Sequence, residues 1–183
     1  MSPGETAEVT LHMLGRHNVS NALAAIAVGV SAGIRLADCA AAIATLRAPD
    51  KRGEIIYHRG ATLINDCYNS NPAALDAMVD ALLSIPAKRH IVVAGEMLEL
   101  GDSSDALHRA SGGKIAAKNI DVILGVRGHA AALVAAAGPK AIYVESPAEA
   151  GAWLAANLRE GDAVLLKASR GVRLEGALAI LLT

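Results

Sequence analysis

The chain has 183 residues, of which 53% are hydrophobic and 2% aromatic, with no phenylalanine. This composition provides for a packed core of aliphatic side chains and excludes a chain that is disordered overall. The formal net charge of −1 argues against a general nucleic-acid-binding protein, which needs a basic surface to bind phosphates.

Targeting signals and membrane spans are not evident. The start of the chain lacks the basic and apolar pattern of a signal peptide, and no apolar run reaches the roughly 18 residues that span a bilayer. Cys39 and Cys67 lie far apart and form no C-x-x-C pair, which favours two reduced thiols. We therefore expect a cytoplasmic protein without a membrane partner.

The first 50 residues favour helices. Residues 8–14 alternate like a strand, although nothing nearby offers them a partner. Ala-rich helices are predicted over 18–32 and 36–46, with Gly33 ending the first of them. The polar segment 48–53 carries Pro and Gly and predicts a domain boundary.

Strands and helices alternate after this boundary. Strands over 54–58 and 61–66 are predicted to form a hairpin at Arg59-Gly60. A helix over 72–84 follows, with Asn71 as its N-cap and Pro72 at its first position. The remaining predicted strands, each followed by a helix, are 90–94, 120–125, 141–145 and 163–167, with helices over 104–118, 129–137, 147–158 and 174–182.

This alternation predicts an α/β fold with a mostly parallel sheet and helices on both faces. Ligands of such folds bind beyond the carboxyl ends of the strands. The segments to inspect are therefore 66–71, 95–101, 125–128 and 167–173.

The turn Asp66–Pro72 is the densest polar cluster after a strand. Asp66 could accept hydrogen bonds from a ribose, Asn69 and Asn71 could donate and accept, and a helix N-terminus favours an anion by about 0.3–1 kcal/mol. Asn and Asp are also ordinary turn and capping residues. A cap suffices for Asn71 alone, but it does not require Asp66, Tyr68 and Asn69 as well.

Three further groups of polar residues are weaker candidates. Lys167, Ser169, Arg170 and Arg173 follow the last strand and suit a carboxylate or phosphate, or they form a solvated loop. Asn18 and Asn21 share a helix face and could hold a flat polar group together, or one could be a cap. Arg52, in the interdomain segment, could reach a ligand or be a solvated linker charge.

Several other patterns carry no site. Gly112-Gly113-Lys114 lies inside a predicted helix and lacks the rest of a phosphate loop. Residues 125–128 are not a G-x-G-x-x-G fingerprint, and no G-x-S-x-G elbow is present. The six histidines show no metal-ligand spacing, so no metal site is predicted in this chain.

Four segments together resemble the Mur ligases. They are G-R-H-N-V-S-N-A-L-A-A at 15–25, D-x-Y-N-x-N-P at 66–72, G-E-M-L-E-L-G at 95–101 and K-A-S-R-G-V-R-L-E at 167–175. Within that family, the resemblance is to members that join D-alanyl-D-alanine to UDP-N-acetylmuramoyl-tripeptide in peptidoglycan precursor synthesis.

The resemblance implies a domain organisation. Mur ligases have a UDP-sugar domain, a central ATPase domain and a Rossmann-like C-terminal domain. Residues 1–50 would be the helical end of the central domain, and 51–183 would be the C-terminal domain. The phosphate loop, the modified lysine and the Mg²⁺ ligands would precede Met1, so this part alone would be inactive.

The resemblance also implies residue roles in an ATP-dependent reaction that proceeds through an acyl phosphate. Asn18 and Asn21 would face the adenine, Arg52 the ATP phosphates and Asp66 the ribose. Tyr68, Asn69 and Asn71 would line the nucleotide pocket. Lys167, Ser169 and Arg170 would lie near the dipeptide; no catalytic residue is assigned.

The chain departs from the family pattern at three positions. Lys51 stands where Gly is usual, Cys67 where Ser or Thr is usual, and Ala168 where Gly is usual, which would matter if residue 168 needed a positive φ. Two alternatives stay open: another Mur-type or cyanophycin-type amide ligase, and a stand-alone, non-catalytic domain that binds a protein or nucleotide.

Overall fold

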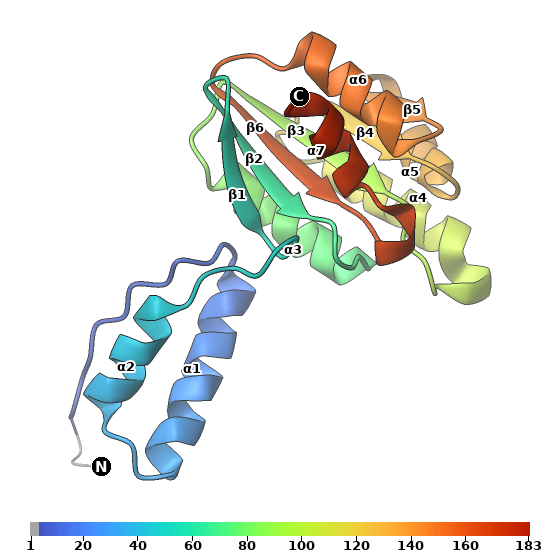
Figure 1. Ribbon diagram of the computed structural model, residues 1–183. Helices are drawn as coiled ribbons and strands as arrows, with labels where there is room; N and C mark the ends of the chain where they lie inside the picture. The colour runs from blue at the N-terminus through green and yellow to red at the C-terminus, as the bar shows by residue number, and fades with distance from the viewer. Residues whose placement is uncertain (1–3) are drawn as a thin grey trace. The chain divides into compact units, whose positions relative to one another are not determined.

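A computed structural model describes residues 4–183, which divide into a first unit ending at Pro49 and a second unit, Asp50–Thr183 (Figure 1). The division falls inside the Pro- and Gly-bearing segment 48–53. Within residues 4–183, no helix combines the length and the apolar character that crossing a bilayer requires.

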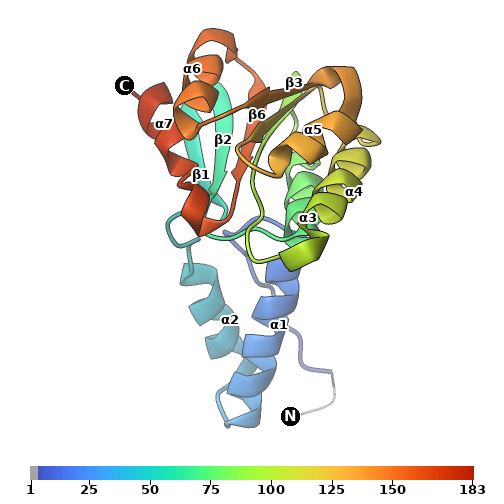
Figure 2. The same cartoon turned by 90° about the vertical axis from the view of Figure 1, so that its right-hand side faces the viewer.

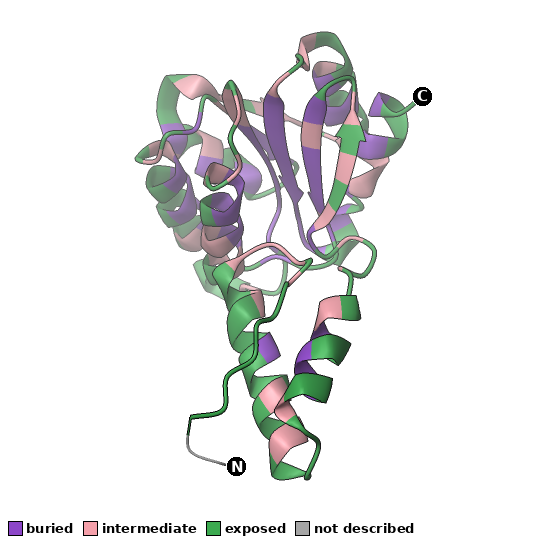
Figure 3. Ribbon diagram, turned by 90° about the vertical axis from the view of Figure 1, so that its left-hand side faces the viewer, coloured by how far each residue is buried: buried purple, intermediate pink, exposed green. Residues whose placement is uncertain are grey.

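The first unit is a pair of helices, α1 (Arg16–Ser31) and α2 (Leu36–Thr45), as predicted. They approach closely at Gly29, where an added Cβ would lie 2.7 Å from the Cys39 sulfur. Most of the surface of the two helices is exposed (Figure 3), including the large apolar side chains of Val19, Leu23 and Val28.

The strand expected over residues 8–14 is not formed. His12 makes one isolated parallel bridge with Arg47, and the rest of this segment has no strand pairing. Alternation of side chains gives a strand only where a neighbouring chain accepts and donates the backbone hydrogen bonds along its length. A single bridge supplies too few of them.

The second unit contains one six-stranded sheet in the order β1-β2-β6-β3-β4-β5. Its strands are β1 (Glu54–His58), β2 (Ala61–Asp66), β3 (Arg89–Gly95), β4 (Val122–Val126), β5 (Ala141–Val144) and β6 (Asp162–Lys167). Only β1 is antiparallel to its neighbour; all other pairs are parallel. The carboxyl ends of β2, β6, β3 and β4 therefore lie at one edge.

Helices cover both faces of this sheet (Figure 2). One face carries α3 (Pro72–Leu83), α4 (Ser104–Ala116) and α5 (Ala130–Ala137); the other carries α6 (Pro147–Asn157) and α7 (Glu175–Leu181). Short 3₁₀ turns span Gly101–Ser103, Gly138–Lys140 and Arg170–Val172. The predicted α/β class, with a mostly parallel sheet and helices on both faces, is confirmed.

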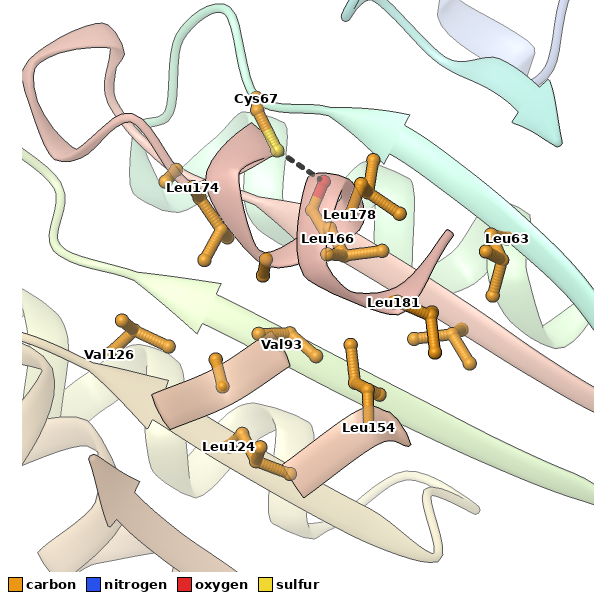
Figure 4. Packing of buried hydrophobic residues seen from close by; sticks show 14 of the residues in the cluster. Leu63, Cys67, Val93, Leu124, Val126, Leu154, Leu166, Leu174, Leu178 and Leu181 are labelled. Atoms are coloured by element: carbon orange, nitrogen blue, oxygen red, sulfur yellow. Dashed lines mark hydrogen bonds between the residues drawn. The ribbon is translucent and has the colours of Figure 1, made fainter. Parts of the chain in front are cut away.

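The core under α6 and α7 is aliphatic (Figure 4). Leu63, Leu124 and Leu166 of the sheet are fully buried in one cluster with Leu154 of α6 and Leu181 of α7. Burying each such side chain contributes about 1.5–3 kcal/mol. The missing phenylalanines are thus replaced by many close contacts between smaller side chains.

Glycines allow the helices to pack closely. An added Cβ at Gly112 of α4 would lie 2.1 Å from the backbone oxygen of Leu133 in α5. The Gly112-Gly113-Lys114 sequence is therefore part of a helix–helix contact, which agrees with its exclusion as a phosphate loop.

Local signals placed the ends of several elements. Arg59 and Gly60 have φ of 48° and 75°, as a two-residue hairpin turn requires. The Asn71 side chain accepts a hydrogen bond from the Ala74 N–H at 2.8 Å, which confirms it as the cap of α3. At the start of α6, Ser146 Oγ accepts from the Glu149 N–H at 3.2 Å, as the capping box predicts, whereas the Glu149 carboxylate accepts from the Glu145 N–H at 3.0 Å instead of that of Ser146.

Candidate functional site

The loops after β2, β3 and β6 enclose a cavity of about 230 Å³ in the second unit. We call it the site cavity. It is lined by Tyr68, Asn69, Leu98, Glu99, Ser169, Arg170 and Gly171. Its position at the carboxyl ends of parallel strands is the one expected for ligands of this fold class.

An ion pair links β2 and β6 at the carboxyl ends of these two strands. Asp66 and Lys167 are register partners at the ends of these neighbouring strands. The Lys167 Nζ lies 2.5 Å from Asp66 Oδ2 and donates to the Asn69 carbonyl at 2.9 Å. The Lys167 side chain is only 3% exposed, so its charge and donors are largely used within the chain.

Ser169 joins two loops. Its buried hydroxyl accepts from the Leu98 N–H at 2.9 Å and donates to the Ser70 carbonyl at 3.3 Å. Its own N–H donates to the Glu96 carbonyl at 3.2 Å. The loop after β3 is thereby attached to the turn after β2 through the loop after β6.

Ala168 fits without strain. Among residues 4–183, the non-glycine residues with positive φ are Lys51, Arg59, Glu99, Arg127 and Arg173, and Ala168 is not one of them. A Cβ added at Gly95 would lie 2.5 Å from the Ala168 Cβ. The methyl group of Ala168 is therefore accommodated because residue 95 is glycine.

Arg52 stacks on Tyr68. The Arg52 guanidinium carbon lies 3.8 Å from the centre of the Tyr68 ring, a cation–π contact of about 0.5–1 kcal/mol at an exposed site. The Tyr68 N–H also donates to the Lys51 carbonyl at 3.1 Å. Lys51 has φ of 60°, a conformation that favours glycine.

Glu175 forms ion pairs with two of the cations. Its Oε1 accepts from Lys51 Nζ at 2.9 Å and from Arg170 Nη1 at 3.1 Å. Partial burial alone would raise the pKa of Glu175, but the hydrogen bond from Lys51 and the charges of both cations hold that pKa below its usual value. Arg170 keeps most of its five N–H donors for other partners, and its side chain is 60% exposed.

Local hydrogen bonds explain part of the polar turn. The Asn69 Oδ1 accepts from the Ser70 N–H at 2.8 Å, and Asn71 is the cap of α3. In the first unit, Asn21 Nδ2 donates to Asn18 Oδ1 at 3.3 Å and Asn18 Nδ2 donates to the Leu14 carbonyl at 2.8 Å. The shared face of Asn18 and Asn21 is present, and their contact with adenine stays a prediction.

The structure thus brings together the candidates of the second unit: Arg52, Asp66, Tyr68, Asn69, Asn71, Lys167, Ser169 and Arg170. It also adds Leu98 and Glu99, which were not selected from the sequence although their loop was placed at the correct edge. The available signal was an acidic residue in a loop directly after a buried strand.

The side chains of the second unit limit which ligands it could bind. In residues 4–183 there is no cluster of three or more His, Cys, Asp or Glu side chains suited to a metal ion. Burial raises the pKa of Cys67 to about 12, so this thiol is a buried structural group whose sulfur contacts the Leu166 carbonyl (Figure 4). The site cavity is smaller than the roughly 300–1,000 Å³ of drug-sized ligand sites, so it suits a small ligand.

Comparison with known proteins identifies the family. Residues 51–170 match the family model "Mur ligase, glutamate ligase domain", and this chain belongs to the Mur ligase family. It is 36% identical over 171 residues to the UDP-N-acetylmuramoyl-tripeptide–D-alanyl-D-alanine ligase of Bacillus subtilis, covering 89% of this chain and 37% of that protein.

Solved structures of relatives have the same fold. MurF of Acinetobacter baumannii superposes with a TM-score of 0.89 at 29% identity, covering 98% of this chain and 40% of that one. MurF ligase of Thermotoga maritima, in complex with ADP, gives a TM-score of 0.82 at 26% identity, covering 92% and 38%. The chain therefore spans well under half the length of these relatives.

Proposed function

We propose that this chain is the C-terminal part of a cytoplasmic, ATP-dependent ligase that joins D-alanyl-D-alanine to UDP-N-acetylmuramoyl-tripeptide. Residues 1–50 would end the central ATP-binding domain, and 51–183 would form the C-terminal domain. One observation carries the proposal: the site cavity is built from 66–72, 95–101 and 167–175, three of the segments on which the family resemblance rests.

In the proposed reaction, the tripeptide carboxylate takes the γ-phosphoryl group of ATP, giving an acyl phosphate and ADP. The dipeptide amine then attacks the acyl carbon, and phosphate leaves as the amide bond forms. This chain would contribute positioning and charge stabilisation. The phosphate loop and the Mg²⁺ ligands would lie in the rest of the protein.

The site cavity suits the dipeptide because its charges are complementary. D-alanyl-D-alanine is a zwitterion, and Arg170 and Glu99 both line the cavity. Arg170 would bind the carboxylate through its free N–H groups, while Glu99 would attract the amine. Ser169 is already committed to Leu98 and Ser70, so it would shape the cavity as well as border it.

Lys167 would act mainly through its partners. Because its ammonium group is buried against Asp66 and the Asn69 carbonyl, it would hold the turn after β2 in place rather than meet the dipeptide first. Asp66 would offer a ribose its second oxygen.

ATP binding would involve Tyr68 and Asn69 of the cavity lining together with residues that do not line it. Arg52 and Tyr68 form a stacked cation and ring, and Arg52 would face the phosphates. Tyr68, Asn69 and Asn71 would border the nucleotide, and Asn18 and Asn21 would face the adenine. The ADP complex of the Thermotoga maritima relative supports a nucleotide as one ligand of the complete protein.

Calorimetric titration of the chain tests the amine specificity. D-alanyl-D-alanine should bind, whereas L-alanyl-L-alanine, lysine, D-glutamate and diaminopimelate should bind more weakly. Preference for one of the single amino acids would instead assign the chain to another Mur-type ligase. Supplied with ATP, tripeptide and dipeptide, the chain alone should release no ADP, and turnover by it would contradict the proposed division of the site.

A further inference from the structure

His108 of α4 is a fully buried side chain that makes two hydrogen bonds. Its Nε2 lies 2.9 Å from the Met97 backbone nitrogen, and its Nδ1 lies 2.7 Å from the Ser104 carbonyl oxygen. Because the Met97 N–H can only donate, Nε2 must accept, and the ring proton must be on Nδ1, which donates to Ser104. The geometry therefore requires a neutral ring in one tautomer.

The Met97 bond is one of a series that holds the loop after β3. The Glu96 N–H donates to the Val126 carbonyl at 3.1 Å, the Met97 N–H to His108, and the Leu98 N–H to Ser169 Oγ at 2.9 Å. Of these acceptors, only His108 can be protonated near neutral pH. The next residues along, Leu98 and Glu99, line the site cavity.

Other titratable groups surround His108. The His129 ring, at the start of α5, lies 5.8 Å away between centroids. The Glu96 side chain accepts from the backbone N–H of His129 at 3.1 Å, and Asp105 Oδ1 is 3.9 Å from the ring Nδ1 of His129. Burial lowers the pKa of His108, and the charge of His129 lowers it further. The hydrogen bond to the Ser104 carbonyl and the charges of Glu96 and Asp105 act in the opposite direction but are outweighed. The ring is thus neutral at neutral pH, as the Met97 bond requires.

We propose that His108 is a positioning residue that sets the cavity wall formed by Leu98 and Glu99 through its bond to the Met97 N–H. Protonation puts a second donor opposite Met97, so this bond is lost and the wall loosens. Ligand binding in the cavity therefore weakens as pH falls. The identity of that ligand rests on the proposed function, whereas the loop anchor does not.

Amide NMR on the complete chain tests the anchor directly. The protection factor of the Met97 amide should fall by about 2- to 10-fold, the effect of one lost hydrogen bond, as His108 becomes protonated at acid pH. Long-range proton–nitrogen spectra should show His108 protonated on Nδ1 at neutral pH. A ring protonated on Nε2 at neutral pH would overturn the proposal.

Three variants separate positioning from general stability. His108→Gln keeps a neutral acceptor near the position of Nε2, so Met97 should stay protected at every pH. His108→Leu removes the acceptor, so the protection factor of Met97 should be lower by the same factor, about 2- to 10-fold, at every pH, while Val93 in β3 reports that the fold is intact. His129→Gln, which replaces the half-exposed neighbour, should keep the pH dependence of Met97 and move its midpoint upward, because the His129 charge that lowers the pKa of His108 is removed. If His108→Leu does not fold, the Met97 protection of His108→Gln and the ring tautomer of wild type still test the proposal.

Dipeptide titrations of the same proteins complete the test. Wild type should bind D-alanyl-D-alanine more weakly at about pH 5.5 than at about pH 7.5, by a factor close to the change in Met97 protection, and His108→Gln should lose this dependence. Unchanged Met97 protection in His108→Leu, or at low pH, would refute the anchor. A pH-sensitive anchor without dipeptide binding would instead refute only the proposed ligand.

Discussion

Lys167 and Asp66 lie side by side at the carboxyl ends of adjacent parallel strands, with Nζ 2.5 Å from Oδ2. They are 101 residues apart in the chain. A buried ion pair costs desolvation energy, and removing one partner leaves the other charge buried and unpaired. The pair therefore makes the turn after β2 and the loop after β6 dependent on each other.

We predict that Lys167→Met lowers the free energy of unfolding by about 3 kcal/mol, because Asp66 loses its buried partner. Adding Asp66→Asn should recover part of this loss, since the unpaired charge is then removed. Urea denaturation of the single and double variants measures the coupling. Asp80→Asn, at an exposed pair with Lys118, should cost less than about 1 kcal/mol; an equal loss there would contradict the account.

The Gly95 and Ala168 contact makes a second prediction. Gly95→Ala should lower the free energy of unfolding by about 1–3 kcal/mol, the usual cost of overpacking, because its Cβ would collide with that of Ala168. Gly95→Ala combined with Ala168→Gly should be closer to wild type. Denaturant midpoints measure both, and a double variant no more stable than Gly95→Ala would show that the strain lies elsewhere.

The lowered pKa of Asp162 predicts that the free energy of unfolding falls at acid pH. Burial alone would raise its pKa, but hydrogen bonds from the Arg89 side chain and the Arg159 N–H, with the charges of both arginines, hold that pKa below 3.8. The unfolded state therefore binds the proton more readily, and the stabilisation, complete above about pH 4, is lost as pH falls through the folded-state pKa.

Asp162→Asn should thus flatten the decline of unfolding free energy at acid pH, as measured by urea titrations at several pH values. Asp102→Asn, at an exposed position, is the matched control and should leave the slope unchanged. A wild-type slope in Asp162→Asn would show that the acid sensitivity comes from other carboxyl groups.

Arg170 predicts the strength of dipeptide binding. Arg170→Ala should weaken D-alanyl-D-alanine binding by about 10-fold or more, the value of a charge-assisted hydrogen bond, and Arg170→Lys should restore only part of it. Arg109→Ala, at an exposed arginine of α4 paired with Asp105, should have no effect. Calorimetry gives the three dissociation constants, and equal values for all three would remove Arg170 from the site.

The sequence was a good guide to features that depend on neighbouring residues. The hairpin at Arg59-Gly60 and the cap at Asn71 follow from local backbone chemistry, so their positions could be predicted within a residue or two. Residues 8–14 show the limit of this reasoning, because strand formation depends on a partner that the pattern itself does not contain.

The contacts within the site could be recognised only from the three-dimensional structure. The sequence placed Asp66 and Lys167 at strand ends, but only the sheet order puts β2 beside β6, where these two candidate ligand contacts also form an ion pair with each other. Leu98 and Glu99 were missed because their role depends on where the loop after β3 folds. His108 has no sequence signal, since its importance comes from the Met97 amide alone.

Mapping dipeptide binding by amide NMR tests the central claim most directly. On addition of D-alanyl-D-alanine, the account predicts shifts concentrated at Tyr68, Asn69, Leu98, Glu99 and residues 169–171, with smaller shifts for L-alanyl-L-alanine at equal concentration. Equal responses to both dipeptides, shifts elsewhere on the surface, or no response at saturating concentration would contradict the assignment of this cavity.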